Sequence, residues 1–125
     1  MITRGVSQEQ KTPVLFSFNT DGVTLDSGGG AEVLLFKRKL DFSKIEYILV
    51  MTRMKMSSGL ATGHLISYID TTSKTDHTSG SDSFSSDMAL IDCTSITGVH
   101  DLSMVYTNVD GNVVLGTVYI GVVDI

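Results

Sequence analysis

The chain has 125 residues, 42% of them hydrophobic and 18% charged, which fits one domain large enough to bury its own core. Nine Lys and Arg against fourteen Asp and Glu leave a formal net charge of −5, so binding to nucleic acid is not expected. No apolar run is long enough to span a bilayer, and no membrane partner is expected. The single cysteine, Cys93, cannot form an internal disulfide, and its alternating apolar context predicts a buried side chain.

The first periodic segment begins at Pro13. In PVLFSFN the alternation predicts a strand whose buried face carries Val14, Phe16 and Phe18. Proline at the first position is typical of a strand at the edge of a sheet. TDGVTLDSGGG then predicts a turn, a short strand and a hinge at residues 28–30.

The segment AEVLLFKRKL predicts a second strand, which loses its apolar character at the basic run Lys37-Arg38-Lys39. We interpret this run as the solvated end of a strand. A phosphate-binding patch is the alternative, but no aromatic or basic residues extend the run.

The segment DFSKIEYILVMTRMKM is apolar on both faces of the strand it predicts. One face carries Ile45, Tyr47, Leu49 and Met51, and the other carries Ile48, Val50, Met54 and Met56. Such a strand is central in a sheet covered on both sides, or it packs at an interface. We therefore expect Leu49 and Val50 both to be buried. HLISYID, at 64–70, is predicted to return as its hairpin partner.

Residues 71–87 contain ten Ser or Thr and one aromatic residue, without periodicity. This composition predicts either a disordered stretch or a functional loop. Further strands are predicted in MALIDCTSITG, in the alternating VHDLSMVYT and in VVLGTVYIGVVDI, which we expect to form a final strand pair over 113–123. Asp110-Gly111 between apolar alternations is a hairpin signal.

These patterns add up to about eight strands and no helix, so we predict an all-β, single-domain fold. Residues 1–12 are polar and aperiodic and are interpreted as an N-terminal arm on a β-sandwich domain at 13–125. Antiparallel strands of this length close best as two packed sheets, which favours a jelly-roll-like antiparallel β-sandwich. An immunoglobulin-type sandwich is the rival, but its Cys–Trp–Cys pattern is absent.

The segment LIDCTSITGVHDLSMVY carries a resemblance to a known family. It has the form apolar-Asp-x-Ser/Thr-x-apolar-x-Gly followed by Gly-x-His/Tyr-x-Leu-x-apolar, at Ile91, Asp92, Thr94, Ile96, Gly98, His100, Leu102 and Met104. This pattern resembles galactose-binding-like jelly rolls and related carbohydrate-binding modules. FSKIEYILVMTRMKM is also similar to a strand in tail and baseplate accessory proteins of phages that infect Gram-positive bacteria.

The resemblance implies a non-catalytic carbohydrate-binding module that serves phage adsorption to a host cell-wall saccharide. It implies a location in the virion (the phage tail) or outside the cell, with a saccharide on the host surface and other virion or tail proteins as partners, and a homo-oligomer as one form of assembly. The alternative is a structural virion domain that binds protein partners and has no sugar site. The chain lacks the Trp platform of many sugar-binding modules.

Sugar binding needs an aromatic ring to stack on the sugar and planar polar side chains to pair with its hydroxyl groups. The segment 71–87 offers such residues, with a solvated flexible loop as the alternative: Asp76, His77, Asp82, Phe84 and Asp87. Arg53, His64 and Tyr68 are expected near the ends of two adjacent strands, where an ordinary half-exposed face is the alternative. Tyr106 and Asn108 border the predicted hairpin, where turn chemistry is the alternative.

No catalytic or metal-binding motif accompanies these residues. The histidines lack the spacing of a zinc site, no G-x-S-x-G elbow is present, and no acidic cluster has the pattern of an EF-hand loop. We therefore expect no enzyme activity and no cofactor, and a structural calcium ion, which is frequent in such jelly rolls, is the alternative. The methionines fit core positions, with an adaptable protein-binding surface as the other interpretation.

Overall fold

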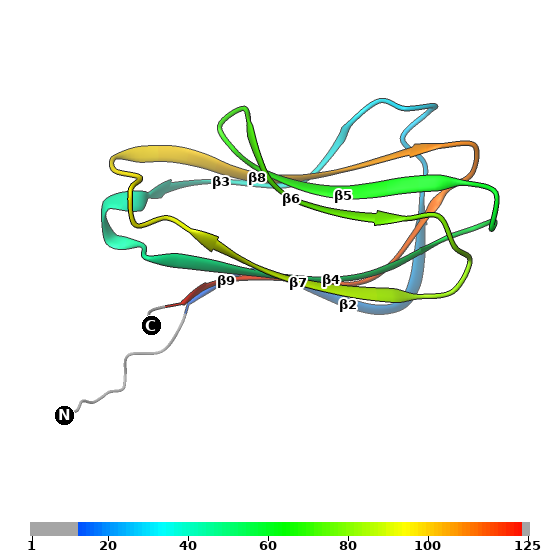
Figure 1. Ribbon diagram of the computed structural model, residues 1–125, viewed down its shortest axis with the longest axis horizontal. Helices are drawn as coiled ribbons and strands as arrows, with labels where there is room; N and C mark the ends of the chain where they lie inside the picture. The colour runs from blue at the N-terminus through cyan, green and yellow to red at the C-terminus, as the bar shows by residue number, and fades with distance from the viewer. Residues whose placement is uncertain (1–12, 124–125) are drawn as a thin grey trace.

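In the computed structural model, residues 13–123 are described and fold into two four-stranded antiparallel sheets packed face to face (Figure 1). The first sheet has the order β2-β9-β4-β7 and the second has the order β3-β8-β5-β6. The strands are β2 (Val14–Leu25), β3 (Val33–Asp41), β4 (Tyr47–Met56), β5 (Thr62–Ile69), β6 (Thr72–Ser79), β7 (Ser85–Asp92), β8 (Val99–Val109) and β9 (Val113–Val123). A short 3-10 helix, η1 (Phe42–Lys44), precedes β4.

The chain passes from one sheet to the other at almost every connection. Only β5 and β6 follow each other in the same sheet, so theirs is the one hairpin among the described strands. This alternation produces a jelly roll and confirms the predicted all-β sandwich. The predicted N-terminal arm, at 1–12, lies outside the described residues. None of the described helices is long and apolar enough to cross a membrane.

Both predicted hairpins were wrong for the same reason. β4 and β5 lie in opposite sheets, as do β8 and β9. Asp110 and Gly111 do form the expected turn, with φ of 56° and 123°, but the turn carries the chain across the sandwich. The final segment is likewise one continuous strand, β9, rather than a strand pair. A turn signal specifies a reversal of the chain, whereas pairing depends on which sheet has a place for the next strand.

The segment 71–87 is not a long loop, so the prediction of a disordered stretch or a functional loop there was wrong. It contains β6 and the start of β7. β6 pairs with β5 along its length and forms the edge of its sheet. The strand was missed because its inward positions carry small or polar residues, among them His77 and Ser79, instead of aliphatic ones. Polar edge strands are one way in which proteins prevent edge-to-edge association.

The core lies between the sheets and is built from alternate residues of each strand. On β4, Ile48, Val50, Met54 and Met56 are at most 3% exposed. The other face of β4 points away from the second sheet, so Leu49 is only half-buried. β4 is central as predicted, between β9 and β7, but the expectation that Leu49 is buried was wrong, because the described residues cover this sheet on one side only.

The start of β2 also differs from the predicted pattern. A bulge between Val14 and Phe16 turns Val14 outward, where it is 52% exposed. Phe16 packs inward at 4.9 Å from the ring of Phe36. β2 is an edge strand, as Pro13 predicted.

Cysteine and methionine positions follow the inner and outer faces. Cys93 is fully buried, and its burial raises the pKa of the thiol. Met54, Met56 and Met104 are fully buried in the core, whereas Met88 is 69% exposed. The core interpretation is therefore confirmed for Met54, Met56 and Met104, and Met88 lies on an outer surface.

A cavity mutation tests this assignment of inner and outer faces. We expect Ile120→Ala, at a fully buried position on β9, to lower the free energy of unfolding by about 2–5 kcal/mol because it leaves an unfilled space. Leu60→Ala, where the side chain is 93% exposed, should change it by less than about 0.5 kcal/mol. Urea denaturation of both variants measures the difference, and equal losses would contradict the assignment.

Candidate binding face

The outer surface of the second sheet gathers polar side chains around one aromatic ring. We call this surface the polar face, and its central residues are Glu32, His64, Tyr68, Asp76, Thr78 and Ser103. The strand register sets their neighbours. Tyr68 on β5 lies between Ser103 on β8 and Ser73 on β6. Two residues along β5, Ile66 lies between Val105 and Asp76.

Tyr68 is fixed by a carboxylate from outside its strand. Its hydroxyl donates to Oε2 of Glu32 at 2.7 Å. This hydrogen bond to a carboxylate, followed by burial, raises the pKa of Tyr68 above its ordinary value, so the hydroxyl keeps its proton. A depression of about 380 Å³ opens beside the pair, lined by Glu32, Tyr68, Asp70, Thr71, Ser103 and Val105.

His64 is held at the other end of β5 by residues of the β6 strand. Its Nδ1 lies 2.9 Å from Oδ1 of Asp76 and 3.0 Å from the hydroxyl of Thr78. The Thr78 hydroxyl donates to the same Asp76 oxygen at 3.0 Å. Since a carboxylate oxygen accepts, Asp76 favours the tautomer with the proton on Nδ1. In the neutral ring, the Nε2 atom of His64 is then an acceptor.

An apolar strip separates the Tyr68 and His64 groups. Ile66 and Val105 lie side by side in the register, with Leu34 opposite Val105 on β3. Leu34 is 55% exposed. The polar face thus offers an aromatic ring and aliphatic groups for C–H surfaces, flanked by donors and acceptors for hydroxyl groups.

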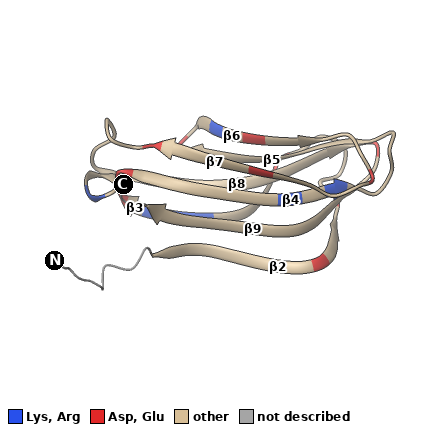
Figure 2. Cartoon of the chain, turned by 60° about the horizontal axis from the view of Figure 1, so that its bottom comes forward, with Lys and Arg blue, Asp and Glu red and all other residues tan. Residues whose placement is uncertain are grey.

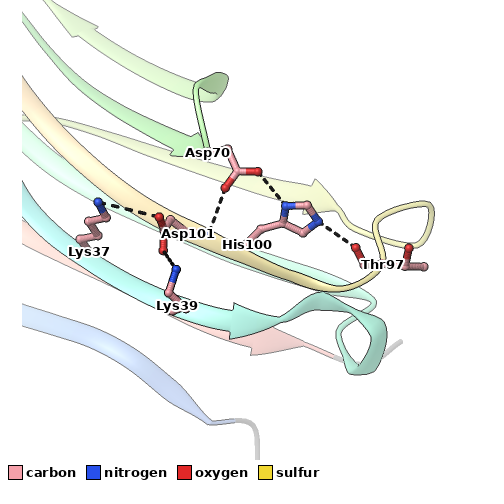
Figure 3. Close-up of polar contacts among 6 residues, drawn as sticks. All are labelled: Lys37, Lys39, Asp70, Thr97, His100 and Asp101. Carbon is pink, nitrogen blue, oxygen red and sulfur yellow. Dashed lines mark hydrogen bonds and ion pairs between the residues drawn. The ribbon is translucent and has the colours of Figure 1, made fainter.

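Basic residues of β3 border this surface. Nζ of Lys39 lies 3.0 Å from Oδ1 of Asp101, and Nζ of Lys37 lies 3.8 Å from Oδ2 of the same residue (Figure 3). Both lysines are exposed, so the run is solvated as expected, but it lies within β3 rather than at the end of the strand. Exposed ion pairs of this kind contribute little to stability.

A histidine clasp joins two turns at one end of the same sheet. Nδ1 of His100 lies 2.7 Å from Oδ2 of Asp70, and Nε2 lies 2.8 Å from the carbonyl oxygen of Thr97 (Figure 3). Both partners accept, so both ring nitrogens donate and the ring is an imidazolium. The bond to Asp70, then the bond to Thr97, raises the pKa of His100.

Asp70 completes the clasp through the backbone of β8. Its N–H donates to the carbonyl of Asp101 at 2.8 Å, and its Oδ1 accepts from the Asp101 N–H at 3.1 Å. The pKa of Asp70 is lowered by the Asp101 N–H first and by His100 second. Asp70 has φ of 55°, a left-handed conformation that Asp tolerates in turns.

His77, predicted as a ligand-binding residue, points between the sheets instead. It is only 7% exposed. Its Nδ1 lies 2.7 Å from Oγ1 of Thr52 on β4, and its Nε2 lies 3.0 Å from Oγ of Ser85 on β7. Burial lowers the pKa of His77, against smaller opposite effects of Asp87 and Asp76. A neutral ring therefore links β6 to the opposite sheet.

Arg53 and Phe84 lie on the other side of the molecule from His64 and Tyr68. Arg53 projects from the outer face of the first sheet, opposite Thr117 and Ser86. Its guanidinium carbon is 3.8 Å from the centre of the Phe84 ring. Arg53 thus covers one face of Phe84, and the predicted grouping of Arg53 with His64 and Tyr68 was wrong because β4 and β5 belong to different sheets.

The remaining predicted binding residues lie in the core or at other parts of the surface. Tyr106 faces inward and packs against the core. Asn108 is 2% exposed, where its Oδ1 accepts from the N–H of Ser27 at 2.8 Å and its amide donates to the carbonyl of Gly111. Asp82 is exposed in the connection between β6 and β7, and Asp87 is exposed within β7. These four residues do not join the polar face.

Sequence reasoning therefore named His64, Tyr68 and Asp76, although it assigned Asp76 to a loop, and it missed the rest of the polar face. Glu32 lies outside any strand, so no periodicity marks it. Thr78 and Ser103 could have been found from the register of β6 and β8, once Asp76 and Thr78 were recognised as alternating with the buried His77. Residues 13–123 contain no group of three or more His, Cys, Asp or Glu side chains that could hold a metal ion.

Comparison with known proteins shows the fold. No protein-family model and no curated protein matches the chain. The CBM36-1 domain of a multidomain xylanase from the hindgut metagenome of Trinervitermes trinervoides matches with a TM-score of 0.57 and 11% identity, over 92% of this chain and 100% of that domain.

Viral structures also match. The structure of the infectious bursal disease virus Gt strain matches with a TM-score of 0.56 and 13% identity, over 98% of this chain and 38% of that one. The VP2 subviral particle of the same virus matches with a TM-score of 0.50 and 13% identity, over 90% and 32%. This chain thus spans about a third of the viral chains. The resemblance to jelly-roll carbohydrate-binding modules is confirmed as a likeness of fold.

The two histidines are predicted to titrate in opposite directions from 6.5, their ordinary pKa. His100 should titrate above it and His77 below it, measured by NMR of the ring protons. Because folding raises the pKa of His100, protonation of its ring stabilises the folded protein. This stabilisation is fully present below pH 6.5 and is lost as the pH rises through the folded-state pKa. Burial of neutral His77 acts in the other direction: its cost appears as the pH falls below 6.5.

The variant Asp70→Asn tests the origin of the raised pKa of His100, with His77 as the internal control. It removes the carboxylate that holds the His100 proton, so the pKa of His100 should fall while that of His77 stays unchanged. An unchanged pKa of His100 in this variant would contradict the clasp.

Proposed function

We propose that the chain is a non-catalytic carbohydrate-binding module whose polar face holds a saccharide of a host cell surface. The observation that carries the proposal is Tyr68, which is fixed by Glu32 beside an apolar strip and an open depression. A sugar ring has the same two kinds of surface, C–H groups on its faces and hydroxyl groups at its rim. The polar face matches both without a metal or cofactor.

The hydrogen-bonding groups of the face suit hydroxyl ligands. The Glu32 carboxylate accepts from Tyr68 through Oε2, and a carboxylate has further acceptor sites for a sugar diol. His64 presents Nε2 to the ligand, because Asp76 holds its other nitrogen, and this atom accepts in the neutral ring and donates in the protonated ring. Ser103 adds a hydroxyl that both donates and accepts. A saccharide lying along β5 would contact Tyr68 and His64 at its two ends.

The biological setting that we propose is adsorption of a phage to its host. The chain would act in the phage tail or baseplate, in the virion or outside the cell, and would contact other virion proteins. The match to a carbohydrate-binding domain supports the sugar site at the level of fold. The match to viral chains supports a virion domain at the same level.

A second candidate function is virion assembly without a sugar site. It is favoured by the first sheet, whose outer surface exposes Met88 and Leu90 at 69% and 48%. The two functions use opposite faces of the sandwich, so variants on each face distinguish them.

The direct test is an NMR titration of the labelled chain with host cell-wall polysaccharide fragments. We expect binding in the micromolar to millimolar range, with shifts at Tyr68, Ser103 and His64. Tyr68→Ala should weaken binding about tenfold or more through loss of the stacking surface, whereas Tyr68→Phe, which keeps the ring and loses the bond to Glu32, should weaken it less.

Leu60→Ala serves as the control, because this exposed residue lies outside the polar face. Circular dichroism shows whether each variant is folded. Shifts that spread over the first sheet instead, or equal binding by Tyr68→Ala and Leu60→Ala, would reject the polar face as the site. Absence of shifts with every host fragment would favour the assembly function.

A further inference from the structure

The outer surface of the first sheet is unusually apolar for a surface exposed to water. We call it the apolar face. Its members are Val14, Leu49, Met51, Met88, Leu90 and Tyr119. Val14, Leu90 and Met88 are 52%, 48% and 69% exposed, and Leu49, Met51 and Tyr119 are half-buried. An exposed apolar patch shared by four neighbouring strands marks an interaction site more often than chance.

The strand register arranges this face in rows across the sheet. Leu90, Leu49, Gly121 and Val14 form one row, and Met88, Met51, Tyr119 and Ser17 form the next. These two rows lie at the centre of the face. On one side of them lies the row of Asp92, Tyr47 and Val123, and on the other side lies the row of Ser86, Arg53 and Thr117.

The charged residues that point outward from the sheet lie at the two ends of the face, and Asp87, opposite Thr52, borders it along the β7 edge. Arg53 and Lys55 lie toward one end of β4, and Asp92 lies at the opposite end, at the tip of β7 (Figure 2). Asp92 is ionised at neutral pH, since its hydrogen bonds from Thr94 lower its pKa. The face is therefore apolar in the middle, positive at one end and negative at the other.

We propose that the apolar face is the interface of a symmetric dimer, in which a second copy of this chain packs face to face about a two-fold axis that lies in the interface and runs across the strands. A two-fold axis along the strands would place Arg53 and Lys55 opposite the same residues of the second copy. The axis across the strands instead reverses the ends, so that Arg53 of each copy approaches Asp92 of the other.

The same axis brings complementary shapes together. It places the row of Leu49 opposite the row of Met51 of the second copy. On β9 the ring of Tyr119 already covers Gly121 of its own chain, so the Tyr119 rings of the two copies meet near the axis. A depression of about 290 Å³ faces Leu90 of the second copy, which is half-exposed and can enter it beside Met51 and Met88; the depression is also lined by Thr52, Arg53, Ser86, Asp87 and Thr117. Interfaces of this kind are isologous and self-complementary.

The size of the face predicts a weak, reversible dimer. Four strands spaced by about 4.8 Å and ten residues of β4 rising about 3.3 Å each cover about 600 Å². Two copies would therefore bury about 1,200 Å², at the lower end of the range for specific interfaces. We expect dissociation in the micromolar range. The polar faces would point outward on both sides of the dimer, although the dimer does not depend on their binding sugar.

Sedimentation velocity of the full 125-residue chain over a range of concentrations tests the dimer. The wild-type chain should pass from monomer to dimer as its concentration rises. Met88→Asp and Leu90→Asp should each shift the midpoint at least about tenfold higher, because they bury a charge in the interface. Leu60→Asp is the matched control, since Leu60 is 93% exposed and lies outside the face. Circular dichroism confirms that each variant is folded.

Distances between two spin labels test the orientation. A label at Lys55→Cys can be attached selectively, because Cys93 is fully buried. The proposed axis crosses β4 at Val50, between the rows of Leu49 and Met51. Lys55 lies five residues from it, so the axis across the strands predicts label sites about 33 Å apart along the strand direction. The axis along the strands predicts about 10–15 Å, near the spacing of packed sheets.

Four outcomes would overturn the proposal. They are a wild-type chain that stays monomeric at every concentration, a control variant as disruptive as Met88→Asp, label distances of about 10–15 Å, and a dimer that forms only when residues 1–12 are deleted. The last outcome would identify that segment as the occupant of the apolar face.

Discussion

The packing of two sheets through one face each is the constraint on which the rest of this structure depends. Because side chains alternate along a strand, every residue that points into the core places its neighbours on an outer surface. Ile48 and Val50 face the core of the sandwich, and so Leu49 faces outward. On β5, Leu65 is buried and fixes His64 and Ile66 on the opposite side. Core burial thus positions the residues of both outer faces, although none of them contributes to the core.

At the edge and the end of the sandwich, hydrogen bonds between polar groups take the place of apolar packing. Along the β6 edge, His77 fills an inward position and bonds to Thr52 of the opposite sheet. A buried imidazole is tolerated there because both of its nitrogens have partners. At the end of the second sheet, His100 and Asp70 join the β5–β6 turn to the segment before β8. The two histidines therefore have opposite electrostatic environments. Burial favours the neutral ring of His77, and Asp70 favours the protonated ring of His100.

The periodic parts of the sequence predicted their strands well, and the failures concern strand pairing and the polar strand β6. The alternation in β4 and β8 identified strands, and the high strand content with no convincing helix led to the jelly roll. Local signals could not show that Asp110-Gly111 crosses between sheets, because that choice depends on distant strands. β6 was missed because its inward positions lack aliphatic residues. For the same reason, the polar face was only half predicted: Asp76 was assigned to a loop, and Glu32 has no periodic context.

The alternation of successive strands between the sheets has a kinetic consequence. Only the β5–β6 hairpin can form from residues adjacent in the chain. Every other described pairing, including that of β2 with β9, joins segments separated by at least one other strand. Loops must therefore close before most contacts stabilise the chain, and a topology of this kind folds slowly, on the order of milliseconds to seconds. In the meantime the future core strands, β4 among them, remain exposed to other chains, and the polar β5–β6 hairpin is the segment best suited to form first.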